Sequence, residues 1–272
     1  MTEPIAKRKF FGQKNNRVIF IVVAVCLLAL LGGVIMDAVL YTRGAIDKQE
    51  FTHRMLFILN TVGAMCIVFV AEILLRMRFP LFLEIAATLF AFAATGLATV
   101  YGFYELVYEW DSVLHTVSGT LFAITGLCVA SLLFRDKLEG TRKAIAWVLF
   151  ALVFSLAIGY LWEIFEYTLD SILPNSDLQP YDVSLLKDAN GNFVTTVIDG
   201  KTYYYTDSMR GSGLLDTMRD MIVHLIGALA LLVPALIIFL KKPSAIDAFA
   251  VTVYPRRNKV NKEKEREFRP EE

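Results

Sequence analysis

The first candidates for a chemical role are Glu163 and Glu166, in the stretch Trp162–Tyr167. This stretch follows an apolar run, Ala144–Ile158, that is long enough to enter a membrane. Two carboxylates at the C-terminal end of such a helix are unfavourable, because the helix dipole is already negative there. Acidic caps belong at helix N-termini, so capping does not explain the pair. We therefore expect a cation, a proton or a polar partner beside it.

Two further motifs carry the same kinds of side chain. Asp111 is followed one helical turn later by His115, and Asp216, Asp220 and His224 recur at spacings of four. Residues at such spacings share one face of a helix, so each motif presents its polar groups in one direction. The motifs together supply carboxylate and imidazole groups, which are ligands of divalent metals.

The elements that position these motifs are predicted membrane-spanning helices. The 272 residues are 56% hydrophobic with a mean hydropathy of +0.53, which is too apolar for a soluble globule of this size. Apolar runs of about 20 residues predict six spans, at 18–41, 55–76, 80–104, 112–134, 144–168 and 216–240. The expected fold class is all-α, a polytopic six-transmembrane-helix bundle with a small extracytoplasmic β-hairpin loop.

The chain divides into a cytoplasmic N-terminal segment (1–17), a membrane domain (18–241) and a disordered cytoplasmic tail (242–272). Disorder is expected in the tail because its charges are mixed and its hydrophobicity is low. The membrane domain includes an extracytoplasmic loop, 169–215, in which Asp199-Gly200 separates two β-prone runs. This pattern predicts a hairpin over 193–205, and we expect it to cover the outer face of the bundle.

Lysine and arginine set the orientation of the spans. The terminal segments and the loops on their side carry 20 of these residues, and the opposite side carries 7. Positively charged loops stay inside, so both termini are predicted to be cytoplasmic. The motifs on spans four, five and six then all lie near the outer surface.

Five carboxylates gather at that level, and Arg219 is the only basic residue within the three motifs. Ionised groups in a poorly solvated site need a partner. Carboxylates with imidazoles suit a divalent ion such as Zn, Mn, Fe or Mg. We predict a divalent metal site with ligands drawn from His115, Glu163, Glu166, Asp220 and His224, and with Asp111 and Asp216 nearer its mouth.

Simpler explanations stay open for several of these residues. Asp111 and Asp216 each suit a helix N-cap. His224 suits a hydrogen-bonded core histidine, and the carboxylates could share protons in place of a metal. Elsewhere, Glu72 lies four residues before Arg76, and we expect the two to pair at the inner interface.

The three motifs, in their order along the chain, resemble those of the YjdF-like bacterial inner-membrane proteins. The matching residues are Trp110-Asp111-x-x-x-His115, Trp162-Glu163-x-x-Glu166 and Asp216-Thr217-x-x-Asp220-Met221. That family is more distantly similar to the VanZ-like proteins, which are associated with glycopeptide-antibiotic tolerance. The resemblance covers about residues 60–240. It implies a multi-pass protein of the plasma (inner) membrane with a polar site, and it implies no particular reaction.

Three functions fit these features. A metal-dependent enzyme would activate water, or polarise an oxygen of a lipid or lipid-linked envelope substrate, with Glu163 or Glu166 as general base. A proton- or cation-coupled transporter would use the carboxylates as an ion site, although the sequence shows no inverted repeat. A non-catalytic scaffold would use them to hold helices together. Membrane lipids are the expected partners, nucleic acid is not, and the oligomeric state is open.

Overall fold

The computed structural model describes residues 16–107, 109–134, 138–172, 178–179, 190, 192, 195–198, 200–204 and 212–253. Six helical segments are long and apolar enough to cross a membrane. They are α1 (Asn16–Thr42), α2 (Lys48–Leu75), α3 (Leu81–Ala91) with its continuation η1 (Phe92–Val100), α5 (Trp110–Phe134), α6 (Gly140–Ile172) and α7 (Ser212–Lys241). The predicted all-α, six-span bundle is confirmed.

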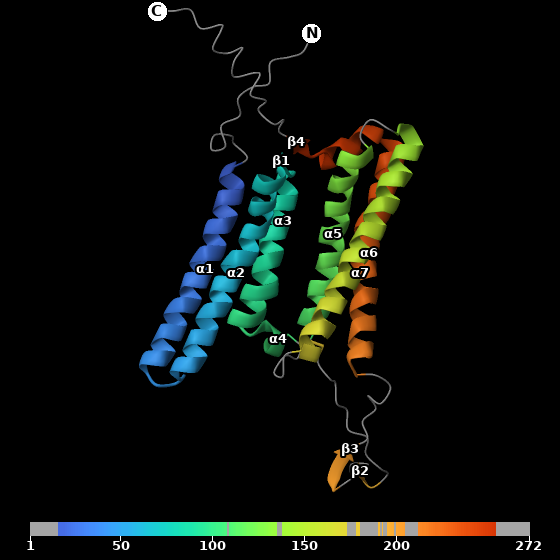
Figure 1. Ribbon diagram of the computed structural model, residues 1–272. Helices are drawn as coiled ribbons and strands as arrows, with labels where there is room; N and C mark the ends of the chain where they lie inside the picture. Colours follow the sequence, from blue (N-terminus) through green and yellow to red (C-terminus); the bar gives the residue numbers. More distant parts are fainter. Residues whose placement is uncertain are drawn as a thin grey trace, which may run out of the picture.

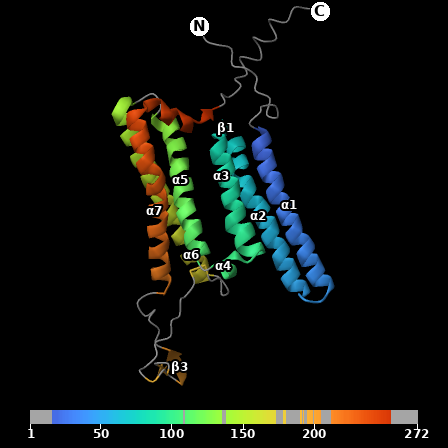
Figure 2. The ribbon, with the colours of Figure 1, turned by 180° about the vertical axis from the view of Figure 1, so that it is seen from behind.

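The helices form two groups of three, which stand side by side in Figures 1 and 2. We call α1, α2 and α3–η1 the N-lobe, and α5, α6 and α7 the C-lobe. The lobes meet mainly where α3 packs against α5. We call the end of the bundle where α1 begins and α7 finishes the terminal end, and the opposite end the hairpin end (Figure 1).

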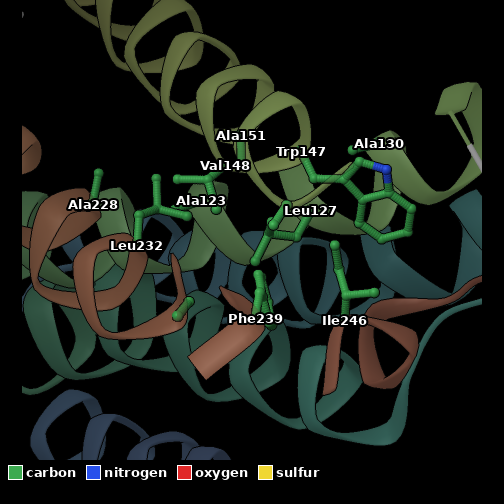
Figure 3. Close-up of a cluster of buried hydrophobic side chains, with 12 residues drawn as sticks. Ala123, Leu127, Ala130, Trp147, Val148, Ala151, Ala228, Leu232, Phe239 and Ile246 are labelled. Atoms are coloured by element: carbon green, nitrogen blue, oxygen red, sulfur yellow. The ribbon is translucent and has the colours of Figure 1, made fainter. Parts of the chain in front are cut away.

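The C-lobe is built on a core of small and large apolar side chains, drawn in Figure 3. Small residues let membrane helices approach closely. The resulting van der Waals contacts hold the helices together where the hydrophobic effect does not act, because the surrounding lipid is also apolar. The buried members are Ala123, Leu127, Ala130, Ala144, Trp147, Val148, Ala151, Ala228, Leu232, Ala235, Phe239 and Ile246.

Two glycines bring α5 and α7 into backbone contact. A Cβ at Gly119 would lie 2.0 Å from the carbonyl oxygen of His224, and a Cβ at Gly227 would lie 1.9 Å from that of Thr116. The Thr120 hydroxyl also donates to the carbonyl of Gly227 at 2.8 Å. These contacts fix the height of α7 against α5, and therefore the height of their polar motifs.

The third span ends earlier than the sequence predicts. It widens into a π-helix over Phe92–Val100 and stops there, short of residue 104. The Tyr101 hydroxyl donates to the carbonyl of Ala29 on α1 at 2.5 Å, which anchors the end of the span. A short helix, α4 (Phe103–Leu106), then leads toward α5.

A β-hairpin forms at the predicted place but does not cover the bundle. Strands β2 (Thr195–Ile198) and β3 (Lys201–Tyr204) pair antiparallel, with Thr195 opposite Tyr204. The hairpin projects away from the helix ends in Figure 1 and contacts none of the described helices. The expected position over the outer face is therefore wrong. The rest of the predicted hairpin and most of the loop 169–215 lie outside the described residues.

The chain beyond α7 is ordered over residues 243–253, where the sequence predicts a disordered tail. The short helix η3 (Pro243–Phe249) is followed by strand β4 (Thr252–Val253), which pairs with β1 (Met77–Arg78). We call residues 243–253 the strap. It is ordered because Ile246 and Val251 are buried, at 3% and 2% exposure. The strap thus runs from the C-lobe to the N-lobe across the terminal end (Figure 1).

Candidate metal site

His115 lies at the centre of a cluster of carboxylates at the hairpin end of the C-lobe. Its Nδ1 is 3.7 Å from Glu163 Oε1 on α6. On the other edge of the ring, Nε2 is 3.8 Å from Asp111 Oδ1 on α5 and 3.9 Å from Asp220 Oδ2 on α7. All three helices of the C-lobe therefore bring a carboxylate to one imidazole.

The distances in this cluster suit an ion between the groups. They exceed the roughly 2.7–3.2 Å of a direct hydrogen bond. Two ligand atoms that each lie about 2.1 Å from a tetrahedral metal ion are about 3.4 Å apart. Two sets of groups have ligand atoms within 4.8 Å of one another: Asp111, His115 and Asp220, and His115, Glu163 and Glu166.

The carboxylates of the cluster are buried and lack a basic partner. Glu163, Glu166 and Asp220 are 4%, 7% and 2% exposed. In the part of the chain that the structure describes, no lysine or arginine forms an ion pair with these three, and Asp220 Oδ2 has no hydrogen-bond partner. Arg219 instead forms an ion pair with Glu109, and this contact lowers the pKa of the Glu109 carboxyl group. The described residues therefore supply no lysine or arginine that could neutralise these carboxylates in the ionised form.

Hydrogen bonds from outside the cluster orient the two glutamates. The indole nitrogen of Trp162 donates to Glu166 Oε1 at 2.8 Å. The side-chain amide of Gln179 donates to Glu163 Oε2 at 3.4 Å and to the Thr217 hydroxyl at 2.8 Å. Glu163 Oε1 is thereby left facing His115, as in metal sites whose ligands are oriented by outer hydrogen bonds.

Gln179 reaches the site because the chain folds back on the end of α6. The Asp170 carboxylate accepts the backbone N–H groups of Leu178 and Gln179 at 2.9–3.0 Å. Gln179 is buried, at 7% exposure, and it lies over Glu163 at the hairpin end. Sequence reasoning missed this residue, because a single glutamine in a loop belongs to no helical pattern.

His224 lies next to the cluster but its ring is held by serines. Its Nδ1 is 3.0 Å from the Ser118 hydroxyl, and its Nε2 is 3.0 Å from both the hydroxyl and the carbonyl oxygen of Ser155. Both ring nitrogens are thus occupied, as in the core-histidine alternative, and His224 is in neither set of converging ligands.

The helix boundaries change how three acidic residues are explained. Helix α7 begins at Ser212, one turn before Asp216, so Asp216 does not cap it, and Asp216 belongs to neither ligand set. Asp111 lies inside the first turn of α5, where the helix dipole favours an anion. Glu163 and Glu166 lie within α6, which continues to Ile172. Their predicted position at a helix C-terminus is therefore wrong. The free-energy cost of ionising these two carboxyl groups comes from their burial and not from the helix dipole.

A small cavity lies between α5, α6 and α7 beside the cluster. It measures about 10 Å³, roughly the space that one water molecule needs. His115, Glu163 and Asp220 line it, with Gly159 and Tyr160 of α6. Tyr160 is 55% exposed, so the cavity adjoins the outer surface of the bundle. The space admits an ion or a water molecule and no larger ligand.

Tyr104 is a second residue that sequence reasoning did not place at the site. The Tyr104 residue is 50% exposed, but the surroundings of its hydroxyl group keep water away from it and so raise its pKa, and the nearby carboxylates of Asp111, Glu166 and Asp220 raise that pKa further. Tyr104 therefore stays protonated and able to donate a hydrogen bond. The sequence indicated only an aromatic residue at the membrane interface.

Comparison with known proteins identifies a family but no solved relative. The family model described as "Predicted membrane protein (DUF2238)" matches residues 18–241. No curated protein and no solved structure matches the chain. The family description does not name the YjdF-like or VanZ-like proteins, so that narrower resemblance stays a prediction.

Proposed function

Since the chain belongs to the DUF2238 family of predicted membrane proteins, we propose that it acts in a membrane as a metal-dependent enzyme. The His115 cluster binds a divalent cation, and the substrate is a lipid or lipid-linked envelope molecule. The observation that carries the proposal is the meeting of buried carboxylates from three helices around one imidazole, with no lysine or arginine paired to Glu163, Glu166 or Asp220 among the described residues.

The two edges of His115 suit different tasks. Asp111 and Asp220 face Nε2, where together with that nitrogen they form a three-ligand set of the kind that leaves a coordination position open. Glu163 faces Nδ1 at 3.7 Å, and a small approach on metal binding would let it accept a hydrogen bond from Nδ1–H and so fix the ring and its tautomer. Under the alternative assignment, Glu163 and Glu166 are the ligands and Asp111 and Asp220 fix the ring.

The remaining groups supply proton transfer and exclude solvent. A bound divalent cation would polarise a substrate oxygen or acidify a bound water molecule. Trp162 holds Glu166 at Oε1, and Oε2 is the oxygen that would accept a proton as general base. Gln179 closes the hairpin end above Glu163 and limits access of bulk water.

The position of the cavity supports a lipid substrate. The cavity has room for an ion or a water molecule and none for a headgroup, so a substrate atom would meet a bound ion at the open edge of the cavity. Tyr160 borders the cavity and is also exposed on the outer face of α6, which lipid covers in a membrane. A lipid-anchored substrate can therefore approach between α6 and α7 while its chains stay in the bilayer.

The orientation forms part of the proposal. The excess of lysine and arginine favours cytoplasmic termini in a plasma (inner) membrane, with the His115 cluster on the extracytoplasmic side. A reporter domain fused after Lys242 tests this. A cytoplasmic signal is expected, and an extracytoplasmic signal would move the cluster to the cytoplasmic side and remove the case for an envelope substrate.

The decisive experiment is metal analysis of the detergent-purified chain. Wild type is expected to retain about one divalent ion per chain, and Asp220→Asn and His115→Ala are expected to lose it. His53→Ala is the matched control, because His53 lies on α2 outside the cluster. A chelator should lower the melting temperature of wild type and of His53→Ala but not that of the two site variants. A wild type without metal, whose melting temperature ignores the chelator, would overturn the proposal.

A proton- or cation-coupled transporter is the second candidate, and one feature favours it. The first three helices and the last three start at opposite ends of the bundle. The groups of more than one buried carboxylate also lie at opposite ends, Glu72 and Glu84 in the N-lobe and the His115 cluster in the C-lobe. Opposed halves of this kind occur in carriers. Proteoliposomes that show cation or proton flux without bound metal would favour this function over the enzyme.

A further inference from the structure

A second pair of buried carboxylates lies at the terminal end of the N-lobe. Glu72 near the end of α2 is 5% exposed, and Glu84 near the start of α3 is 1% exposed. Arg78 Nε lies 3.1 Å from Glu84 Oε1 and 3.9 Å from Glu72 Oε1. The sequence predicts Arg76 as the partner of Glu72, which is wrong. Arg76 ends α2 in the left-handed conformation, at φ 53°, and its side chain is exposed.

Among the described residues, one carboxylate oxygen of this pair has no hydrogen-bond partner. The backbone N–H of Phe79 donates to Glu72 Oε1 at 2.7 Å, and Arg78 donates to Glu84 Oε1. Glu84 Oε2 is buried and has no hydrogen-bond partner in the described ranges. The Oε1 atoms of Glu72 and Glu84 both face Arg78 Nε, so the two carboxyl groups lie close to one another. Ionised carboxylates only accept hydrogen bonds, so two of them at one buried place repel each other unless a proton lies between them.

The charges lead to the same conclusion. Two carboxylates face one guanidinium group, which leaves one negative charge to neutralise in a site shielded from water. The elements around the pair carry the uncharged residues Thr252 and Val253 of β4 and the Cys128 thiol of α5. They also carry two cations, Arg17 of α1 and Arg76 at the end of α2, and both are exposed. Within the described ranges, neither carboxylate forms an ion pair with any group except Arg78.

We propose that Glu72 and Glu84 form a proton-binding site, in which one proton is shared between the two carboxyl groups. With the proton bound, Glu84 Oε2 is no longer an acceptor without a hydrogen-bond donor but can itself donate a hydrogen bond. The pair then keeps one negative charge opposite Arg78. A metal cation fits less well, because hard cations take about six oxygen ligands and Arg78 already brings a positive charge to the pair. This site lies in the other lobe and at the other end from the His115 cluster, so it does not depend on the metal proposal.

Infrared spectroscopy of the full-length protein in detergent at neutral pH tests the proposal. The difference between the wild-type spectrum and the Glu84→Gln spectrum is expected to show the carbonyl band of a protonated carboxyl group. This band should shift when H₂O is replaced by D₂O. Glu72→Gln should lose the same band, because the remaining Glu84 then pairs with Arg78 alone. Glu139→Gln, which replaces an exposed glutamate, should keep it. Identical spectra for wild type and both site variants would overturn the proposal.

The pH dependence of thermal unfolding gives an independent measurement. Near neutral pH the folded chain binds one proton more than the unfolded chain. The free energy of unfolding therefore falls as the pH rises. One retained proton changes the unfolding equilibrium constant by about tenfold per pH unit. Glu84→Gln and Glu72→Gln should each remove this contribution and flatten the curve between pH 6 and 8, whereas Glu139→Gln should not. Wild-type stability that follows sodium or potassium concentration and ignores pH would instead indicate a monovalent cation site.

Discussion

The N-lobe and the C-lobe both bury acidic side chains, but they neutralise them differently. In the N-lobe, Asp37 is 1% exposed and contacts Arg54 at 3.3 Å, and Glu72 and Glu84 share Arg78. In the C-lobe, three helices bring carboxylates to the imidazole of His115. A guanidinium group is always charged, whereas an imidazole can be neutral and can bind a metal.

The packing of the lobes differs in the same way. The C-lobe helices touch through backbone atoms at Gly119 and Gly227, which leaves little freedom for the polar groups next to them. In the N-lobe, a Cβ added at Gly33 or Gly96 would meet side-chain atoms at 3.0 Å but no backbone, and one added at the exposed Gly63 on α2 would meet nothing within 4 Å. The close-packed lobe therefore carries the site that needs fixed geometry, and the fixed arginines of the other lobe serve mainly its own stability. Three substitutions test this contrast.

The largest effect is expected from Gly227→Ala. Its Cβ would lie 1.9 Å from the Thr116 carbonyl oxygen, so α5 and α7 must separate. Overpacking of this kind costs about 1–3 kcal/mol, and the backbone contact places this variant at the upper limit. The matched change Gly63→Ala should instead stabilise α2 by about 0.5–1 kcal/mol. Melting temperatures in detergent check both, and an equal response of the two variants would remove the distinction between the lobes.

Arg54→Gln should have the next largest effect. It leaves Asp37 buried without its cation, and a buried acceptor that loses its partner costs about 1–3 kcal/mol. Metal content should not change, because the His115 cluster belongs to the other lobe. Unfolding by denaturant and metal analysis of the same preparation measure the two outcomes. Loss of metal in this variant would show that the lobes are coupled.

Gln179→Ala should have the smallest effect on stability and a clear effect on exchange. It removes hydrogen bonds worth about 0.5–1.5 kcal/mol each, and it opens the hairpin end above Glu163. Bound metal should leave faster in the presence of a chelator. Replacing residues 195–204 by a short Gly-Ser linker should leave that rate unchanged, because the hairpin contacts none of the described helices. Faster exchange in the linker variant alone would assign the cover to the hairpin instead.

The sequence predicts the helices well and the contacts between them less well. Apolar runs gave all six spans, and the spacing of His115, Glu163 and Asp220 placed them on facing helices. The separation of His224 from the cluster depends on Ser118 and Ser155, two serines that resemble any small residue of a membrane helix. Such partners come from other helices, and hydrophobic periodicity carries no information about them.

Segments outside the spans were the least predictable. Composition indicated a disordered chain beyond residue 242. Residues 243–253 are nevertheless ordered, because Ile246 and Val251 pack against apolar side chains of the bundle. The pairing of Glu72 with Arg78, and not with Arg76, follows from the left-handed residue that ends α2. Helical spacing does not apply beyond the end of a helix, so a prediction based on it fails there.

The strap sets an order of assembly during synthesis. Strand β1 (Met77–Arg78) enters the cytosol early in translation if the proposed orientation holds, and its partner β4 (Thr252–Val253) emerges only after all six spans have left the ribosome. The N-lobe must therefore wait in the bilayer with this strand unpaired until the C-lobe has been inserted. Pairing of β1 with β4 then marks the completed molecule, and a nascent chain stalled before residue 252 would lack this connection between its lobes.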